Sequence, residues 1–276
     1  MPKTTKKKLH GRQPSRKSRP KLSARHRRQM IAQPKIKQPA AQVKQPQHYI
    51  GEPMESPLFN AVVGTVVLIL LYLLFTSILA GISYLAYSQG LMSQNNYSFV
   101  LYVASLIPLT LSVLVYLTLY KKLNLKDAWD NIGLNIGRLT FRIFIMGALI
   151  FAIVFCLEIA VNIAAQATNV QVNTNVQSAF AGAPLWFYFF ASVIEPINEE
   201  IFFRGFLSKR IGILPSSILF GLAHYSYNST FGIEIIAAFI FGTIAAYIFK
   251  KTGSLYPGII AHIGVNTLAS LSILFT

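Results

Sequence analysis

The chain has 276 residues and a formal net charge of +16, although only 12% of its residues are charged. The charge is concentrated at one end, because residues 1–50 hold 15 of the 25 Lys and Arg residues and none of the nine Asp and Glu residues. The rest is nearly neutral and strongly apolar, whereas a soluble domain of this size needs far more surface charge. The composition therefore excludes an ordinary soluble protein and predicts an integral membrane protein.

Residues 1–57 are predicted to form a disordered, basic cytoplasmic tail. Apolar residues are sparse there, and Pro34, Pro39 and Pro46 interrupt any helix. No apolar run directly follows the basic start, so a cleavable signal peptide is not expected. Such a tail either serves topology alone or also attracts anionic lipid. Without interleaved aromatic residues, specific nucleic-acid binding is not expected.

Seven apolar segments follow the tail and predict an all-α fold, a polytopic membrane helix bundle of about seven transmembrane helices. A helix needs roughly 20 apolar residues to cross the hydrocarbon core, with a range of about 17–25. Six segments meet this length, and the fifth is short. Residues 58–138 would hold two helices and a basic loop, and residues 139–276 the remaining core. The segments are Leu58–Tyr87, Phe99–Tyr120, Leu139–Ala165, Pro184–Leu207, Leu214–Tyr225, Ile233–Phe249 and Tyr256–Phe275.

The loops between these segments predict the orientation. If all seven segments cross, every basic loop falls on the same side as the basic tail, as the positive-inside rule requires. The expected arrangement is a multi-pass cell-membrane protein of bacterial type, with a cytoplasmic amino terminus and an external carboxyl terminus. A re-entrant fifth segment would put the last basic pair on the wrong side. The basic loop residues are Lys121, Lys122, Lys126, Arg138, Lys209, Arg210, Lys250 and Lys251.

The fourth segment carries four charges that are costly in a membrane: Glu195, Glu199, Glu200 and Arg204. Each costs at least about 2.5–3.5 kcal/mol at the bilayer centre. Glu195 and Glu199 share a helical face, and Glu200 and Arg204 have the i,i+4 order that favours an ion pair. A buried structural pair explains Glu200 and Arg204 but leaves Glu199 as a carboxylate in need of partners. Pro196 removes a backbone hydrogen bond in the same helix.

Polar side chains on later segments are candidate partners of Glu199. His224 lies on the fifth segment, and His262 and Asn266 lie one turn apart on the seventh. A lone His in a membrane helix is usually a core residue with a satisfied hydrogen bond. Here, however, a rise of about 1.5 Å per residue places Glu199, His224 and His262 at similar depths, roughly 9–15 Å below the cytoplasmic boundary. We therefore expect one cytosol-facing pocket to hold them. Cys156, the single cysteine, is expected to be a small buried hydrophobe.

Three motifs on successive helices resemble those of the CPBP (Abi) family of intramembrane proteases. Residues 199–204 (EEIFFR) fit EExxxR, residues 220–224 (FGLAH) fit FxxxH, and residues 262–266 (HIGVN) fit HxxxN. The family includes type II CAAX prenyl endopeptidases and bacteriocin-processing or self-immunity proteins. The resemblance covers roughly residues 139–275.

The resemblance implies a mechanism. Glu199, with His224 beside it, would activate a water as the general base, while His262 and Asn266 would stabilise the oxyanion. Glu200 and Arg204 would support the helix. The chemistry is reasonable by itself, because desolvation makes a carboxylate more basic and donors aimed at an oxyanion lower the barrier. The favoured mechanism uses no cofactor. Two His and one Glu also form a catalytic zinc set, which stays an alternative.

Three functions are compatible with these sequence features. The favoured one is an endopeptidase acting on a membrane-associated protein or peptide. The second is a non-catalytic immunity or scaffold protein that binds a peptide or partner helix in the same pocket. The third is a small transporter with Glu158 and Glu195 as a proton or ion relay, although no internal repeat with paired broken helices is evident. A base opposite oxyanion donors favours the enzyme, because binding alone does not require it.

Overall fold

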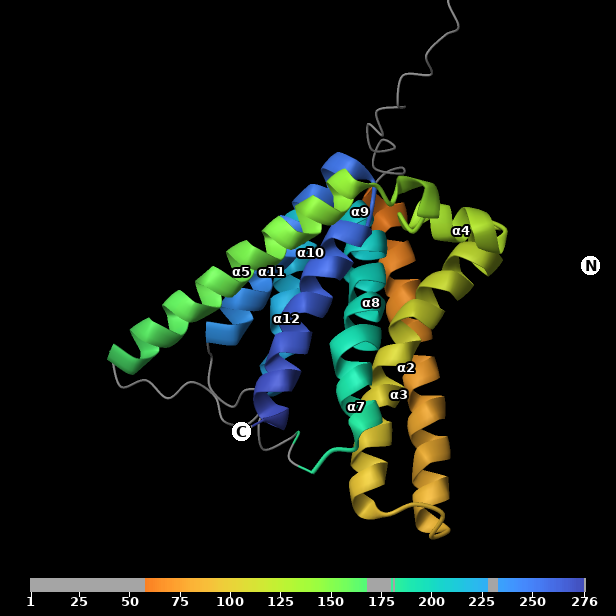
Figure 1. The fold of residues 1–276 in the computed structure, drawn as a ribbon. Coiled ribbons are helices and arrows are strands. Elements are labelled where there is room, and N and C mark those ends of the chain that lie inside the picture. The colour runs from red at the N-terminus through yellow and green to blue at the C-terminus, as the bar shows by residue number, and fades with distance from the viewer. Residues whose placement is uncertain (1–57, 168–179, 181, 228–232, 276) are drawn as a thin grey trace, which may run out of the picture. The chain divides into compact units, whose positions relative to one another are not determined.

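A computed structural model of the chain describes residues 58–167, 180, 182–227 and 233–275. Every regular element in these ranges is helical (Figure 1). The predicted all-α class is therefore confirmed. The basic tail and the loop at residues 168–179 lie outside the described residues. Against the prediction, Cys156 is exposed on the surface of its helix.

The first two helices, α2 (Leu58–Ser88) and α3 (Gln94–Val115), form an antiparallel hairpin (Figure 1). Gly90, with φ of 72°, provides the left-handed turn between them, and the Ser93 side chain caps α3 by accepting from the Asn96 N–H. The chain continues from α3 into a π-helical turn, η1 (Tyr116–Tyr120). Many large apolar side chains of α2 are exposed, as expected for a helix in lipid.

The basic loop after η1 is hydrogen-bonded to two other parts of the bundle. It contains α4 (Leu125–Asn131) and the 3₁₀ turn η2 (Ile136–Arg138). Lys209 donates to the Asn131 carbonyl, and Arg138 Nη1 donates to the Gly253 carbonyl at 2.5 Å. The loop at 121–138, the end of the fourth predicted segment and the turn before the last helix therefore lie together at one end of the bundle. These are the basic loops that the sequence assigns to one side of the membrane.

One composite helix runs through the centre. It consists of α7 (Leu185–Phe189), η3 (Phe190–Ile194), α8 (Glu195–Glu199), η4 (Glu200–Leu207) and α9 (Ser208–Ile211), of which η3 and η4 are π-helical. Pro196 lies in the first turn of α8 and does not interrupt the chain of helical turns. Wider π-helical turns accommodate such a residue and are common at functional sites. Asn198 Nδ2 donates to the Ile194 carbonyl at 2.7 Å beside the proline.

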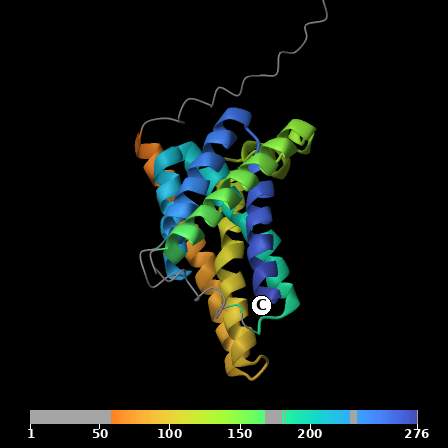
Figure 2. The ribbon, with the colours of Figure 1, turned by 60° about the vertical axis from the view of Figure 1, so that its left-hand side comes forward.

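The other helices pack around this composite helix. They are α5 (Phe141–Ala167), α10 (Ile213–Ala223) with the 3₁₀ turn η5 (His224–Tyr227), α11 (Ile233–Thr252) and α12 (Tyr256–Leu274). The composite helix contacts α3 and α12, and α5 runs obliquely across α12 (Figures 1 and 2). At Gly221, an added Cβ would lie 2.9 Å from the Ile235 carbonyl, so glycine allows α10 and α11 to pack closely.

Five described helices are long and apolar enough to cross a membrane, which supports a membrane protein. The composite helix is also long, but it carries the four charges noted above. Helix α10 has 11 residues, or about 16 Å at 1.5 Å per residue, against a hydrocarbon core about 30 Å thick. The fifth predicted segment is therefore short, as expected, and the count of seven spans stays a prediction. The five ranges are Ala61–Ser88, Gln94–Tyr120, Phe141–Ala160, Ile235–Thr252 and Tyr256–Leu274.

Candidate functional site

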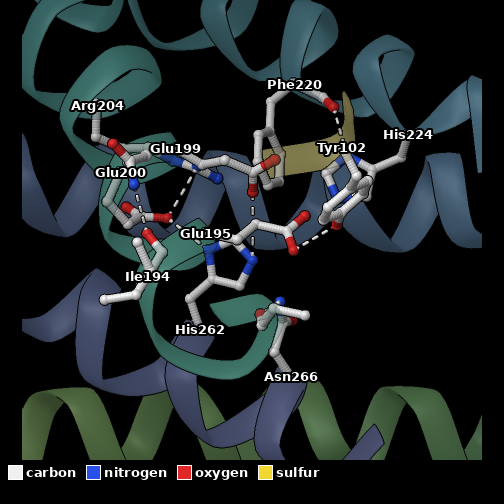
Figure 3. A network of polar contacts seen from close by, with 12 residues as sticks. Tyr102, Ile194, Glu195, Glu199, Glu200, Arg204, Phe220, His224, His262 and Asn266 are labelled. Carbon is white, nitrogen blue, oxygen red and sulfur yellow. Dashed lines mark hydrogen bonds and ion pairs between the residues drawn. The ribbon is translucent and has the colours of Figure 1, made fainter. Parts of the chain in front are cut away.

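Three charged residues are buried where α8 passes into η4. The exposed fraction is 6% for Glu199, 0% for Glu200 and 1% for Arg204. Figure 3 shows them with side chains that arrive from other helices. Because an unpaired buried charge costs several kcal/mol, the partners of each group indicate its role.

Glu200 and Arg204 form the ion pair predicted from their spacing. Glu200 Oε1 lies 2.9 Å from Arg204 Nη1. The guanidinium of Arg204 stacks on the ring of Phe220 from α10, with Cζ 3.8 Å from the ring centroid. Gly258 of α12 lets this helix approach the carboxylate, since a Cβ there would lie 2.6 Å from Glu200 Oε2. The pair is therefore enclosed by three helices.

His262 lies between two carboxyl groups of the composite helix (Figure 3). Its Nδ1 lies 3.2 Å from Glu200 Oε1, and its Nε2 lies 3.6 Å from Glu199 Oε2. A carboxylate oxygen only accepts, so Nδ1 carries the proton and donates to Glu200. Glu199 Oε2 is buried and has no hydrogen-bond partner among the described residues. Glu199 thus presents an acceptor oxygen beside an imidazole.

His224 stands at the point where α10 becomes the η5 turn. Its Nδ1 donates to the Phe220 carbonyl at 2.9 Å, which leaves the lone pair of a neutral ring on Nε2. The Phe220 ring centroid lies 4.6 Å from that of His224 and 5.8 Å from that of His262. Phe220 therefore contacts both motif histidines as well as Arg204. The sequence motif contains Phe220 but does not by itself indicate these contacts.

Asn266 reaches the composite helix one turn beyond His262. Its Nδ2 donates to the Ala191 carbonyl of η3 at 3.0 Å. An amide nitrogen has two N–H groups, so one further donor is present on the same atom. The structure thus brings Glu199, Glu200, Arg204 and His262 into one contact network, with Asn266 anchored one turn away.

Glu195 and Tyr102 belong to the same region and were not among the predicted site residues. The Tyr102 hydroxyl donates to Glu195 Oε2 at 2.5 Å. The spacing of Glu195 and Glu199 predicts that they share a helical face, but nothing in the sequence pattern of α3 indicates Tyr102. The pair is separated by 93 positions in the chain, so only the tertiary structure reveals it.

The arrangement of His, Cys, Asp and Glu side chains bears on whether the site could hold a metal ion. Among the described residues, no group of three or more His, Cys, Asp or Glu side chains is arranged to hold one. The metal-free mechanism and its zinc alternative both stay predictions.

A buried carboxylate, two imidazoles and an ion pair thus lie on neighbouring helices of a helical membrane protein. Residues 181–268 match the family model described as Type II CAAX prenyl endopeptidase Rce1-like. The matched residues contain all three motifs, and the predicted resemblance to CPBP proteases is confirmed at this level. The match supports a CAAX-type intramembrane protease in general. No curated protein and no solved structure matches the chain.

Proposed function

We propose that the protein is an intramembrane endopeptidase that hydrolyses a peptide bond of a membrane-associated protein or peptide. The observation that carries the proposal is the environment of Glu199. This carboxylate is buried in an apolar helix bundle, and its Oε2 has no hydrogen-bond partner among the described residues. It faces the imidazole of His262 within the segment that matches the family model.

Glu199 is the general base of the proposed reaction, with His224 as its helper. The carboxylate takes a proton from a water molecule, and the resulting hydroxide adds to the scissile carbonyl carbon. When the C–N bond breaks, the proton passes to the departing amine. His224 is proposed to help hold the water, because the hydrogen bond from its Nδ1 to the Phe220 carbonyl fixes the orientation of its ring.

His262 and Asn266 are the proposed oxyanion donors. His262 Nδ1 already donates to Glu200, so Nε2 can donate to an oxyanion only when the ring carries both protons. Glu200, which is paired with Arg204, stays the acceptor for Nδ1 of such an imidazolium. Asn266 keeps one N–H group beyond its bond to Ala191. Donors preorganised in this way stabilise developing charge without rearrangement.

We further propose that the end of the bundle with the basic loops faces the cytosol of a cell membrane. The loop at 121–138, Lys209 and the turn at Gly253 are joined there by hydrogen bonds. Anionic lipid at that surface is the expected partner of the basic tail.

The test is a turnover assay of the full-length protein in lipid vesicles. The probes are a fluorogenic farnesylated CAAX peptide and its unprenylated form, each given to wild type and to Glu199→Gln. Turnover of either peptide by wild type, absent in the variant and resistant to chelators, supports the proposal. Loss of turnover on chelation with recovery on added zinc would replace the metal-free mechanism. Binding of the peptides without turnover by wild type would favour the scaffold or immunity function.

A further inference from the structure

Pro196 is a fully buried residue in the first turn of α8, and the proposed reaction gives it no part. A proline nitrogen carries no hydrogen, so it cannot donate to a carbonyl of the preceding helical turn. The missing donor frees one backbone acceptor in the buried part of the composite helix. The hydrogen-bond pattern of the turn before α8 identifies this acceptor.

That turn, η3, is π-helical, and hydrogen bonds of this kind join residues five positions apart. The N–H of Glu195 donates to the Phe190 carbonyl in this way. In the same pattern, the next N–H along the chain would donate to the Ala191 carbonyl. Because that next residue is Pro196, the Ala191 carbonyl loses its helical donor. Ala191 is 3% exposed, and a buried carbonyl of this kind is normally paired elsewhere in the protein.

Asn266 of α12 supplies a donor to this carbonyl. Its Nδ2 lies 3.0 Å from the Ala191 carbonyl oxygen. One turn later on α12, Ser270 accepts a 2.8 Å hydrogen bond from Ser192 of η3. One turn earlier, His262 approaches both carboxyl groups of the site (Figure 3). The polar contacts of α12 with the composite helix therefore follow one face of α12 at intervals of four residues.

We propose that Pro196 is a positioning residue that acts through Asn266. By lacking an N–H, it makes the Ala191 carbonyl the acceptor of the Asn266 side chain, and this bond fixes the axial register of α12 against the composite helix. The register holds His262 between the two carboxyl groups and orients the remaining N–H of Asn266. The inference deepens the proposed function and rests on it for its effect on turnover, whereas the hydrogen bond itself does not depend on turnover.

The replaced hydrogen bond links the energetic effects of Pro196 and Asn266. With proline at position 196, removal of the Asn266 amide leaves the buried Ala191 carbonyl without this donor, and an unpaired buried acceptor is costly. With any other residue at position 196, a backbone N–H is present to donate to the same carbonyl. Loss of the Asn266 amide should therefore cost more stability beside a proline than beside another residue.

Thermal unfolding of the purified full-length protein in lipid tests this link in a double-mutant cycle of Pro196→Ala and Asn266→Ala. Asn266→Ala should lower the Tm of wild type, and in Pro196→Ala this Tm loss should fall to about half or less, because the new N–H pairs with the Ala191 carbonyl. Pro108→Ala is the matched control, since Pro108 is a fully buried proline inside α3. In that background, Asn266→Ala should lower the Tm as much as in wild type. Equal losses in all three backgrounds would overturn the link.

Turnover of the fluorogenic peptides separates positioning from a merely structural role. Pro196→Ala should lower kcat by about tenfold or more with little change in KM, because Asn266 loses its fixed orientation and a small misplacement of a reacting group is costly. Pro108→Ala should keep both values. An unchanged kcat in folded Pro196→Ala would overturn the positioning role.

A second variant covers the case in which Pro196→Ala does not fold. Pro196→Val restores the same N–H and keeps the same number of side-chain carbon atoms, and it then decides both comparisons. Absence of turnover in wild type would reject the proposed function, and the Tm comparison would still decide whether Pro196 and Asn266 are linked.

Discussion

His262 donates from Nδ1 to Oε1 of Glu200 at 3.2 Å, so the ring is held by the carboxylate that follows the proposed base in the chain. The same oxygen lies 2.9 Å from Arg204 Nη1. The ion pair therefore does more than stabilise one helix, because it also orients an imidazole on α12. A change at Arg204 should disturb both the fold and the oxyanion site.

Glu199→Gln should abolish turnover and leave protein yield and thermal stability close to wild type. Glutamine preserves the shape of the side chain and removes only the base, whose contribution is typically about 10²–10⁴-fold in rate. Peptide turnover in vesicles and thermal unfolding in detergent check this. Glu158→Gln on α5 is the matched control and should retain turnover. Full biological function of a strain carrying Glu199→Gln would reject catalysis.

Arg204→Ala should lower protein yield as well as activity. It removes the cation paired with the buried Glu200 carboxylate and the stacking on Phe220, and breaking such a pair typically costs about 3–5 kcal/mol. Thermal unfolding of the purified variant measures the loss. Lys126→Ala should unfold like wild type, because the Lys126 side chain in its ion pair with Asp130 is 82% exposed. Equal stability of the two variants would contradict a structural role for Arg204.

Asn266→Ala should reduce kcat by about 10²–10³-fold with little change in KM, as expected for the loss of one oxyanion donor. It also removes the hydrogen bond to Ala191, which by itself is worth about 1 kcal/mol. Ser270→Ala separates these effects. It breaks the 2.8 Å hydrogen bond between Ser192 and Ser270, which joins the same two helices, and should reduce stability but not kcat. Similar kcat values in both variants would assign Asn266 to structure alone.

Reporter fusions should find the end of the bundle with the basic loops in the cytosol. A fusion after Lys126 or Lys251 should be active as a cytoplasmic reporter, and one at Asn173 or Thr276 as an external reporter. The expectation rests on the hydrogen bonds that gather the basic loops at one end. An external signal at Lys251 would mean that the chain re-enters the membrane at α10 without crossing it.

Removal of residues 1–47 should leave insertion, thermal stability and turnover unchanged. These residues contain too few apolar side chains to contribute to a core. The truncated protein is compared with the full chain in vesicles with and without anionic lipid. A normally inserted truncated protein that has lost turnover in both would contradict this prediction.

The class of protein and most candidate residues follow from the amino-acid sequence alone. Long uncharged segments can only be helices in lipid, because every backbone polar group there must be satisfied within the segment. The i,i+4 spacing of Glu200 and Arg204 likewise predicts their ion pair, since helical geometry alone brings the two side chains together. The sequence also shows that the fifth apolar segment is shorter than the other six.

Contacts between residues on different helices, in contrast, are known only from the folded structure. It assigned His262 to the space between Glu199 and Glu200, made Phe220 the contact between Arg204 and His224, and paired Tyr102 with Glu195. Such contacts depend on the axial register and rotation of one helix against another, which close packing at residues such as Gly258 sets. Apolar periodicity carries little of this information in a membrane, because lipid-facing and protein-facing surfaces are both apolar.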